Sequence, residues 1–259
     1  MESEYTSSPQ PLADIPTQPA EKQLLAPVWH TILIAGIMLA NSYLAAKLMA
    51  SKRGSPGVGK TRIGDYVLTI GFELFLLLLV WVGLRFKGYK IRDLIGGKWS
   101  SPEDFLIDLG IAIGFWIVSA LILAALAYLL GQTSAPQVND MKQRLAALVP
   151  RSGTELALFV SLSVVAGFIE EIIFRGYLQR QIGAIFGNIY VGLALSAVIF
   201  GASHGYEGIR NMIRICVFGA LFGALALMRK SLRPGMIAHA TQDGLVGIVT
   251  YALSKSGKF

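Results

Sequence analysis

The sequence is poor in cysteine, in histidine and in charge. It has one cysteine, Cys216, and 3 histidines among 259 residues, and only 15% of its residues are charged. A single thiol forms neither a disulfide framework nor a four-thiolate metal site, so redox chemistry is not expected and any metal would depend on histidine and carboxylate ligands. The scarcity of charge also excludes a disordered chain, because disordered segments carry many charges and few apolar residues.

Apolar residues fill the chain instead. They make up 54% of it, and the mean hydropathy is +0.57, which is too apolar for an ordinary soluble domain. The formal charge of +7 would suit a nucleic-acid partner, but the basic residues stand singly or in twos and threes between long apolar runs. We therefore expect an integral membrane protein that is surrounded by the lipid bilayer and binds no nucleic acid.

Long apolar stretches follow one another along the chain. Most contain roughly 18 to 25 residues, enough for a helix to cross about 30 Å of hydrocarbon. Their Leu, Ile, Val, Ala and Phe residues do not alternate with polar ones, which favours helices over barrel strands. The sequence predicts an all-α, polytopic transmembrane bundle of about seven spans, within a range of about six to eight. The stretches lie near residues 30–50, 66–84, 105–130, 155–178, 184–203, 211–228 and 235–252.

The N-terminal segment and one connection between spans differ in composition from the apolar stretches. Residues 1–28 are rich in Ser, Pro and Gln and lack the features of a signal peptide, so we expect a disordered tail followed by one membrane domain, 29–259. Near 138–149, apolar residues recur every three or four positions among polar ones, which predicts a short helix in the membrane surface. A compact chain without targeting signals is typical of bacteria, and we expect it in the bacterial cytoplasmic membrane.

One segment matches a nucleotide-binding motif in the wrong context. The residues from Gly54 to Thr61 fit the phosphate-loop pattern letter by letter. That loop binds phosphate where it follows a buried strand and opens a helix of a soluble α/β domain, whereas here it connects two expected spans. A short basic turn with glycine and proline accounts for the same letters, so we expect no nucleotide partner.

Ionisable residues occur at three places in otherwise apolar helices, where charge is costly and usually functional. Glu170 and Glu171 end one apolar run, His204 ends another, and His239 and Asp243 stand four positions apart in a third. Each alone has a structural explanation: an interfacial ion pair, a hydrogen-bonded membrane histidine or a solvated acid at a helix end. Their occurrence together in the last four expected spans favours a chemical site in a common cavity.

Helical spacing divides the two glutamates between two roles. Residues four apart share a face, whereas neighbours diverge by about 100°. Glu171 is therefore predicted to pair with Arg175, and Glu170 points elsewhere and is free for chemistry. Glu73 also lies in an apolar span and is a further candidate for the site. It has no histidine or second acid beside it, so a packing or hydration role is the preferred interpretation.

Three motifs in order resemble those of the CAAX protease and bacteriocin-processing family, known as CPBP or Abi. Each is weak alone, but their order and their places on predicted membrane helices make a specific signal over residues 150–250, the predicted catalytic core. The motifs are Glu170-Glu171-Ile-Ile-Phe174-Arg175-Gly176, then Ser196 with Phe200-Gly-Ala-Ser-His204, and then Ser231-Leu-Arg-Pro234-Gly235-Met-Ile-Ala-His239-Ala-Thr-Gln-Asp243.

The resemblance implies an intramembrane endopeptidase that cleaves a protein or peptide substrate. It is similar to the type II CAAX prenyl proteases, which remove the last three residues of prenylated proteins. In such enzymes, the residues at the positions of Glu170 and His204 are taken to activate water, with the glutamate as general base. The residues at the positions of His239 and Asp243 are taken to stabilise the oxyanion. The supporting residues would be Glu171, Arg175 and Phe200.

The cofactor is left open by the sequence. Asp243 stands where the family more commonly has Asn, and an ionised carboxylate donates no hydrogen bond to an oxyanion, so Asp243 is either protonated or serves another purpose. Glu170, His204, His239 and Asp243 are also suitable ligands for Zn²⁺, and the family is often called metalloprotease. A His-Glu-x-x-His pair, which would indicate zinc directly, is absent.

Two functions of other classes use the same residues. A proton- or ion-coupled transporter would employ the carboxylates and histidines as a relay, and would show ion flux without new peptide termini. A noncatalytic membrane scaffold on the same fold would tolerate Glu170→Ala together with His204→Ala.

Overall fold

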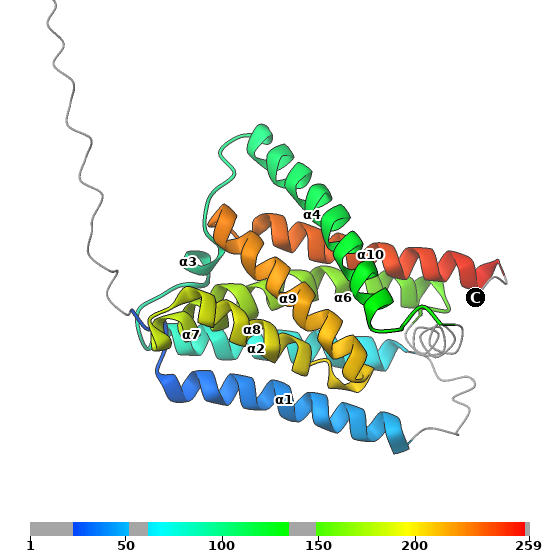
Figure 1. The fold of residues 1–259 in the computed structure, drawn as a ribbon, viewed down its shortest axis with the longest axis horizontal. Coiled ribbons are helices and arrows are strands. Elements are labelled where there is room, and N and C mark those ends of the chain that lie inside the picture. The colour runs from blue at the N-terminus through cyan, green and yellow to red at the C-terminus, as the bar shows by residue number, and fades with distance from the viewer. Residues whose placement is uncertain (1–22, 52–61, 135–148, 257–259) are drawn as a thin grey trace, which may run out of the picture.

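The computed structural model describes residues 23–51, 62–134 and 149–256, and all regular structure within these ranges is helical (Figure 1). Two segments depart from α-helical geometry: η1 is π-helical and η2 is a short 3-10 turn. The elements in chain order are α1 (Val28–Ser51), α2 (Ile63–Arg85), α3 (Ile91–Ile95), α4 (Pro102–Leu129), α6 (Gly153–Glu170), η1 (Glu171–Leu178), α7 (Gln179–Phe186), α8 (Ile189–Ala202), η2 (Gly205–Glu207), α9 (Ile209–Arg229) and α10 (Arg233–Lys255).

The predicted all-helical, membrane-spanning fold is confirmed. Within the described residues, 5 helical segments are long and apolar enough to cross a membrane: α1, α2, α4, the continuous run of α6, η1 and α7, and α9. The expected span near 184–203 corresponds to α8, an apolar helix of 14 residues, which is shorter than a full crossing needs. The expected span near 235–252 corresponds to α10, whose polar residues lower its hydropathy.

Three sequence predictions fall wholly or largely outside the described residues. They concern the surface helix near 138–149, the segment from Gly54 to Thr61, and residues 1–22 of the tail. The end of the predicted tail is described, and it is packed: Leu25 and Ala26 are buried, and their backbone amides donate to Gln181 Oε1 over 2.6 and 3.3 Å. The expected disorder therefore does not extend to these residues, which are docked on α7.

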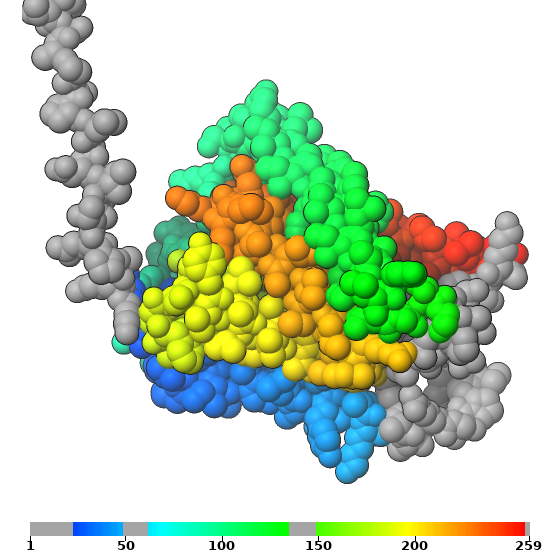
Figure 2. Space-filling view, viewed as in Figure 1, coloured from blue at the N-terminus to red at the C-terminus, as the bar shows by residue number. Residues whose placement is uncertain are grey.

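The helices enclose an interior and leave α4 on the outside. α6 packs along both α10 and α2, while α9 packs along α8. α4 lies across α9 and α10 and projects from the rest of the molecule (Figure 2), with only 11% of its apolar window buried.

The most buried segment is η1. All 8 of its residues are buried, and Ile173, Phe174 and Tyr177 belong to the main hydrophobic core. Burying an apolar side chain of this size contributes roughly 1.5 to 3 kcal/mol, so η1 is held firmly in the centre of the bundle. The glutamate pair at the junction of α6 and η1 is fixed with it. π-helical turns occur frequently at functional sites.

Gly167 allows α6 to approach α10 closely. A Cβ atom on Gly167 would lie 2.5 Å from the backbone nitrogen of Ala240, far inside van der Waals contact. We expect Gly167→Ala to lower the free energy of unfolding by about 3 kcal/mol, because backbone has to move. Thermal unfolding in detergent measures this effect. Gly244 on α10 is the matched control: its added Cβ would have its nearest neighbour, the Ser163 Cβ, at 4.0 Å, so equal destabilisation by Gly244→Ala would contradict the explanation.

Candidate active site

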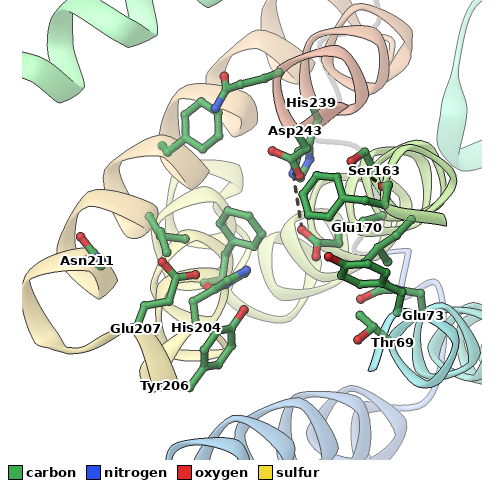
Figure 3. A pocket seen from close by; sticks show the side chains of 18 of the residues that line it. Thr69, Glu73, Ser163, Glu170, His204, Tyr206, Glu207, Asn211, His239 and Asp243 are labelled. Carbon is green, nitrogen blue, oxygen red and sulfur yellow. Dashed lines mark hydrogen bonds and ion pairs between the residues drawn. The ribbon is translucent and has the colours of Figure 1, made fainter. Parts of the chain in front are cut away.

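A cavity of about 550 Å³ lies between the helices. Its size is typical of a site for a small molecule or peptide segment. Glu170 enters its wall from α6, His204 from the turn between α8 and η2, and His239 and Asp243 from α10 (Figure 3). The residues proposed from the sequence as the chemical site are thus brought to one cavity, although they come from helices far apart in the chain.

Glu171 and Arg175 form the predicted pair beneath this cavity. Arg175 Nη1 donates to Glu171 Oε1 over 2.8 Å, and the two side chains are only 2% and 1% exposed. The same Oε1 atom accepts from His239 Nδ1 over 3.1 Å. Glu171 therefore has a second partner that local spacing does not predict, since His239 lies on α10. The ion pair is connected directly to the imidazole that faces the cavity.

Aromatic rings enclose Arg175. Its guanidinium carbon lies 4.5 Å from the centroid of the Phe200 ring and 4.9 Å from that of Phe222, distances at which a cation is attracted to the ring face. Its Nη2 atom also donates to the carbonyl of Gly219 over 3.2 Å. Phe200 contacts the His204 ring as well, with centroids 5.0 Å apart. Phe200 thus packs between the buried cation and a cavity histidine.

The orientation of the His204 ring is set by the backbone of Phe200, one turn earlier in the chain. Its Nδ1 atom lies 2.9 Å from the carbonyl oxygen of Phe200, which only accepts hydrogen bonds, so Nδ1 carries a hydrogen. In the neutral ring Nε2 is then the basic nitrogen. Glu170 and His204 both line the cavity, and no direct hydrogen bond joins them in the described structure.

His239 lies between carboxyl groups. Its Nε2 atom is 3.7 Å from Glu170 Oε2 and 3.7 Å from Asp243 Oδ2. Because Nδ1 donates to Glu171, a neutral ring would present a lone pair on Nε2 toward these two carboxyl groups. That arrangement is repulsive unless Nε2 or one of the carboxyl groups carries a further proton. The geometry thus requires at least one shared proton among Glu170, His239 and Asp243.

The cavity wall includes residues that the sequence analysis did not assign to the site, among them Glu73 and Tyr206. Glu73 on α2, for which the sequence favoured a packing or hydration role, is 7% exposed and lines the cavity. Tyr206 in η2 lines the cavity near His204, with ring centroids 5.9 Å apart, and its burial raises the pKa of the phenol well above its ordinary value. Tyr206 therefore keeps its proton as a donor. Glu73 carried the same signal as the other membrane acids, whereas Tyr206 carried none.

The side chains do not fit a metal ion. In the parts of the chain that the structure describes, no three His, Cys, Asp or Glu side chains converge closely enough to hold one. The set proposed as possible zinc ligands, Glu170, His204, His239 and Asp243, therefore shares a cavity but does not form the compact tetrahedral arrangement that zinc prefers.

A comparison with family models agrees with the three motifs. Residues 152–245 match the model of the type II CAAX prenyl endopeptidases, Rce1-like. The segment is similar to Rce1-like CAAX proteases. It extends from just before α6 into α10, and it contains Glu170, His204, His239 and Asp243. The resemblance to CPBP and CAAX proteases is thereby confirmed at the level of the family. No curated protein and no solved structure gives a significant match to the chain.

Proposed function

We propose that this protein is an intramembrane endopeptidase of the CAAX prenyl protease type. One observation carries the proposal: Glu170 and His204, from separate helices of a membrane-spanning bundle, line one cavity inside the segment that matches the family. The family similarity supports a protease that acts on a peptide substrate. Residence in the bacterial cytoplasmic membrane stays a prediction from the sequence.

The first step of the proposed reaction activates a water molecule. The Glu170 carboxylate removes a proton from water, and Nε2 of His204 accepts a hydrogen bond that orients it. The water oxygen then attacks the carbonyl carbon of the scissile peptide bond. A well-placed general base contributes about 10² to 10⁴ to the rate, and no serine or cysteine nucleophile is needed.

The second group of residues stabilises the negative charge that develops on the carbonyl oxygen. With the shared proton on Nε2, His239 donates toward this oxygen, and a protonated Asp243 does the same. Such donors contribute about 10² to 10³ each where water is excluded. Glu171 fixes the His239 ring through Nδ1, and Arg175 balances the buried charge of Glu171. This assignment gives Asp243 a role that an ionised carboxylate lacks.

The test measures new peptide termini. Purified protein in lipid vesicles is incubated with a farnesylated peptide that ends in a cysteine, two aliphatic residues and one further residue, and the products are identified by mass spectrometry. We expect release of the intact carboxyl-terminal tripeptide by the wild type and none by His204→Ala. Ion-dependent flux in the same vesicles without any cleavage would instead favour the transporter.

A broader search covers other substrates. Membranes that contain either the wild-type protein or Glu170→Gln are compared by sequencing the termini of their proteins. Termini that occur only with the wild type identify substrates, prenylated or not. Identical sets of termini, together with an uncleaved farnesylated peptide, would contradict the endopeptidase proposal.

Chelation should leave this activity unchanged. The residues that the structure describes offer no compact set of ligands in the cavity, and the proposed chemistry is carried by protein groups. We expect the rate after dialysis against 1,10-phenanthroline to equal that of the untreated protein, and elemental analysis to find no stoichiometric zinc. A loss of activity that added Zn²⁺ restores would overturn this expectation.

A further inference from the structure

Glu73 is a buried carboxyl group that the steps above do not use. It lies on α2, is 7% exposed, and lines the same cavity as Glu170 and His204. Its Oε2 atom is fully buried and has no hydrogen-bond partner among the described residues. Leaving a buried polar group unpaired costs about 1 to 3 kcal/mol, and more if it is charged. A side chain kept at this cost inside a reaction cavity calls for a chemical explanation.

The other buried acids of the described structure are all paired. Glu171 accepts from Arg175 and His239, and Asp108 accepts from Arg229 and Trp99. The remaining one, Glu155, accepts from the backbone amides of Arg62, just before α2, and Arg151, just before α6. Glu73 differs from these three because, within the part of the chain that is described, its buried Oε2 atom accepts no hydrogen bond and the carboxyl group forms no ion pair within 4 Å.

Glu73 and Glu170 therefore have different surroundings on the same cavity. His239 Nε2 lies 3.7 Å from Glu170 Oε2, so a positive imidazole is at hand to stabilise the Glu170 carboxylate. Glu73 has no imidazole within this distance among the described residues, and a buried carboxyl group without a close partner in an apolar helix is stable as the neutral acid. Two carboxyl groups in contrasting surroundings are the arrangement by which enzymes separate a base from an acid.

We propose that Glu73 is the general acid that protonates the amine leaving group. This step builds on the proposed endopeptidase function. Glu170 takes a proton from water, the water oxygen bonds to the carbonyl carbon, and the carbon–nitrogen bond breaks while Glu73 gives its proton to the nitrogen. Glu73 is left as a carboxylate and regains a proton from Glu170 through water in the cavity. One water molecule is consumed, and the products are a carboxylic acid and an amine.

The test compares two leaving groups. Glu73→Gln keeps the size and a hydrogen-bond donor of the neutral acid, but the amide does not release a proton. Its kcat and KM are measured with the farnesylated peptide and with the matching depsipeptide, in which an ester replaces the scissile amide. We expect kcat for the amide to fall by about 10²-fold with KM unchanged, because general acid catalysis is lost. Ester cleavage should stay near the wild-type rate, since an alcohol leaves with less need for a proton.

Thr69→Val is the matched control. Thr69 lies one turn before Glu73 on α2 and lines the same cavity, and its hydroxyl donates to the backbone of Asp65. We expect Thr69→Val to leave the ratio of amide to ester cleavage unchanged. Glu73→Met removes the proton with an apolar side chain that suits a membrane helix. It should show the same selective loss, and it supplies the comparison if Glu73→Gln does not fold.

Each contrary result points to a separate failure. Unchanged amide cleavage by the folded Glu73 variants, or an equal loss on amide and ester, would overturn the general acid assignment while wild-type cleavage still supports the endopeptidase. A wild-type protein that cleaves neither substrate would contradict the proposed function itself, and the assignment of Glu73 would fall with it.

Discussion

Replacing Glu170 with glutamine should lower kcat for peptide cleavage by about 10⁴-fold, the upper end of what a general base contributes. Glutamine has the same shape, but its amide accepts no proton from water at neutral pH. We expect KM to stay near its wild-type value, because the lost proton transfer occurs only after substrate has bound. Initial rates with the farnesylated peptide over a range of substrate concentrations separate the two constants.

Ser163→Ala is the control for this variant. Ser163 lies two turns before Glu170 on α6 and lines the same cavity, but its hydroxyl donates to the carbonyl of Phe159 over 2.9 Å. Its removal leaves the proposed chemistry in place, so cleavage should continue at the wild-type rate. If Glu170→Gln cleaved as fast as Ser163→Ala, the proposed base would be wrong.

Local patterns predicted what local geometry determines. The four-residue spacing of Glu171 and Arg175 predicted their ion pair, and it also left Glu170 on a different face from that pair. Uninterrupted apolar runs predicted that several helices are able to cross a membrane, because this property depends only on the length and composition of each helix. The common cavity of Glu170, His204 and His239 was predicted because ionisable side chains in membrane helices are costly in lipid and therefore face the interior of the bundle.

Contacts between distant segments were out of reach of these patterns. The hydrogen bond from His239 to Glu171 joins α10 to η1, and the cation–ring contact of Arg175 with Phe200 joins η1 to α8. Both depend on helix packing, which one sequence does not encode in any local spacing. Glu73 was set aside because no partner stands beside it along the chain, whereas its neighbours in the cavity come from other helices.

The π-helical geometry of η1 was also unexpected. Apolar patterning predicted one continuous helical span here, and we found no local signal for the wider turn of Glu171–Leu178. Its effect is visible only in the packed structure, where Glu171 turns toward Arg175 and His239 while Glu170 lines the cavity. The different surroundings of Glu170 and Glu171 therefore depend both on helical spacing and on the packing of other helices around them.

The second large effect concerns Arg175. Arg175→Met removes the cation from a buried pair and leaves the Glu171 carboxylate in an apolar interior with His239 as its remaining partner. Breaking a buried ion pair from one side typically costs about 3 to 5 kcal/mol, and we expect a loss of that size in the free energy of unfolding. Thermal unfolding followed by circular dichroism in detergent measures it.

The exposed pair of Arg92 and Asp93 supplies a comparison. Its atoms are 3.9 Å apart and its Arg92 side chain is 77% exposed, so Arg92→Met should change stability by less than about 1 kcal/mol. The double variant Glu171→Gln with Arg175→Met removes both buried charges and should recover much of the loss, because the penalty comes from a charge left without its partner. If the double variant were less stable than Arg175→Met alone, the buried charge of Glu171 would not be the cause, and packing of the arginine against Phe200 and Phe222 would have to explain the loss.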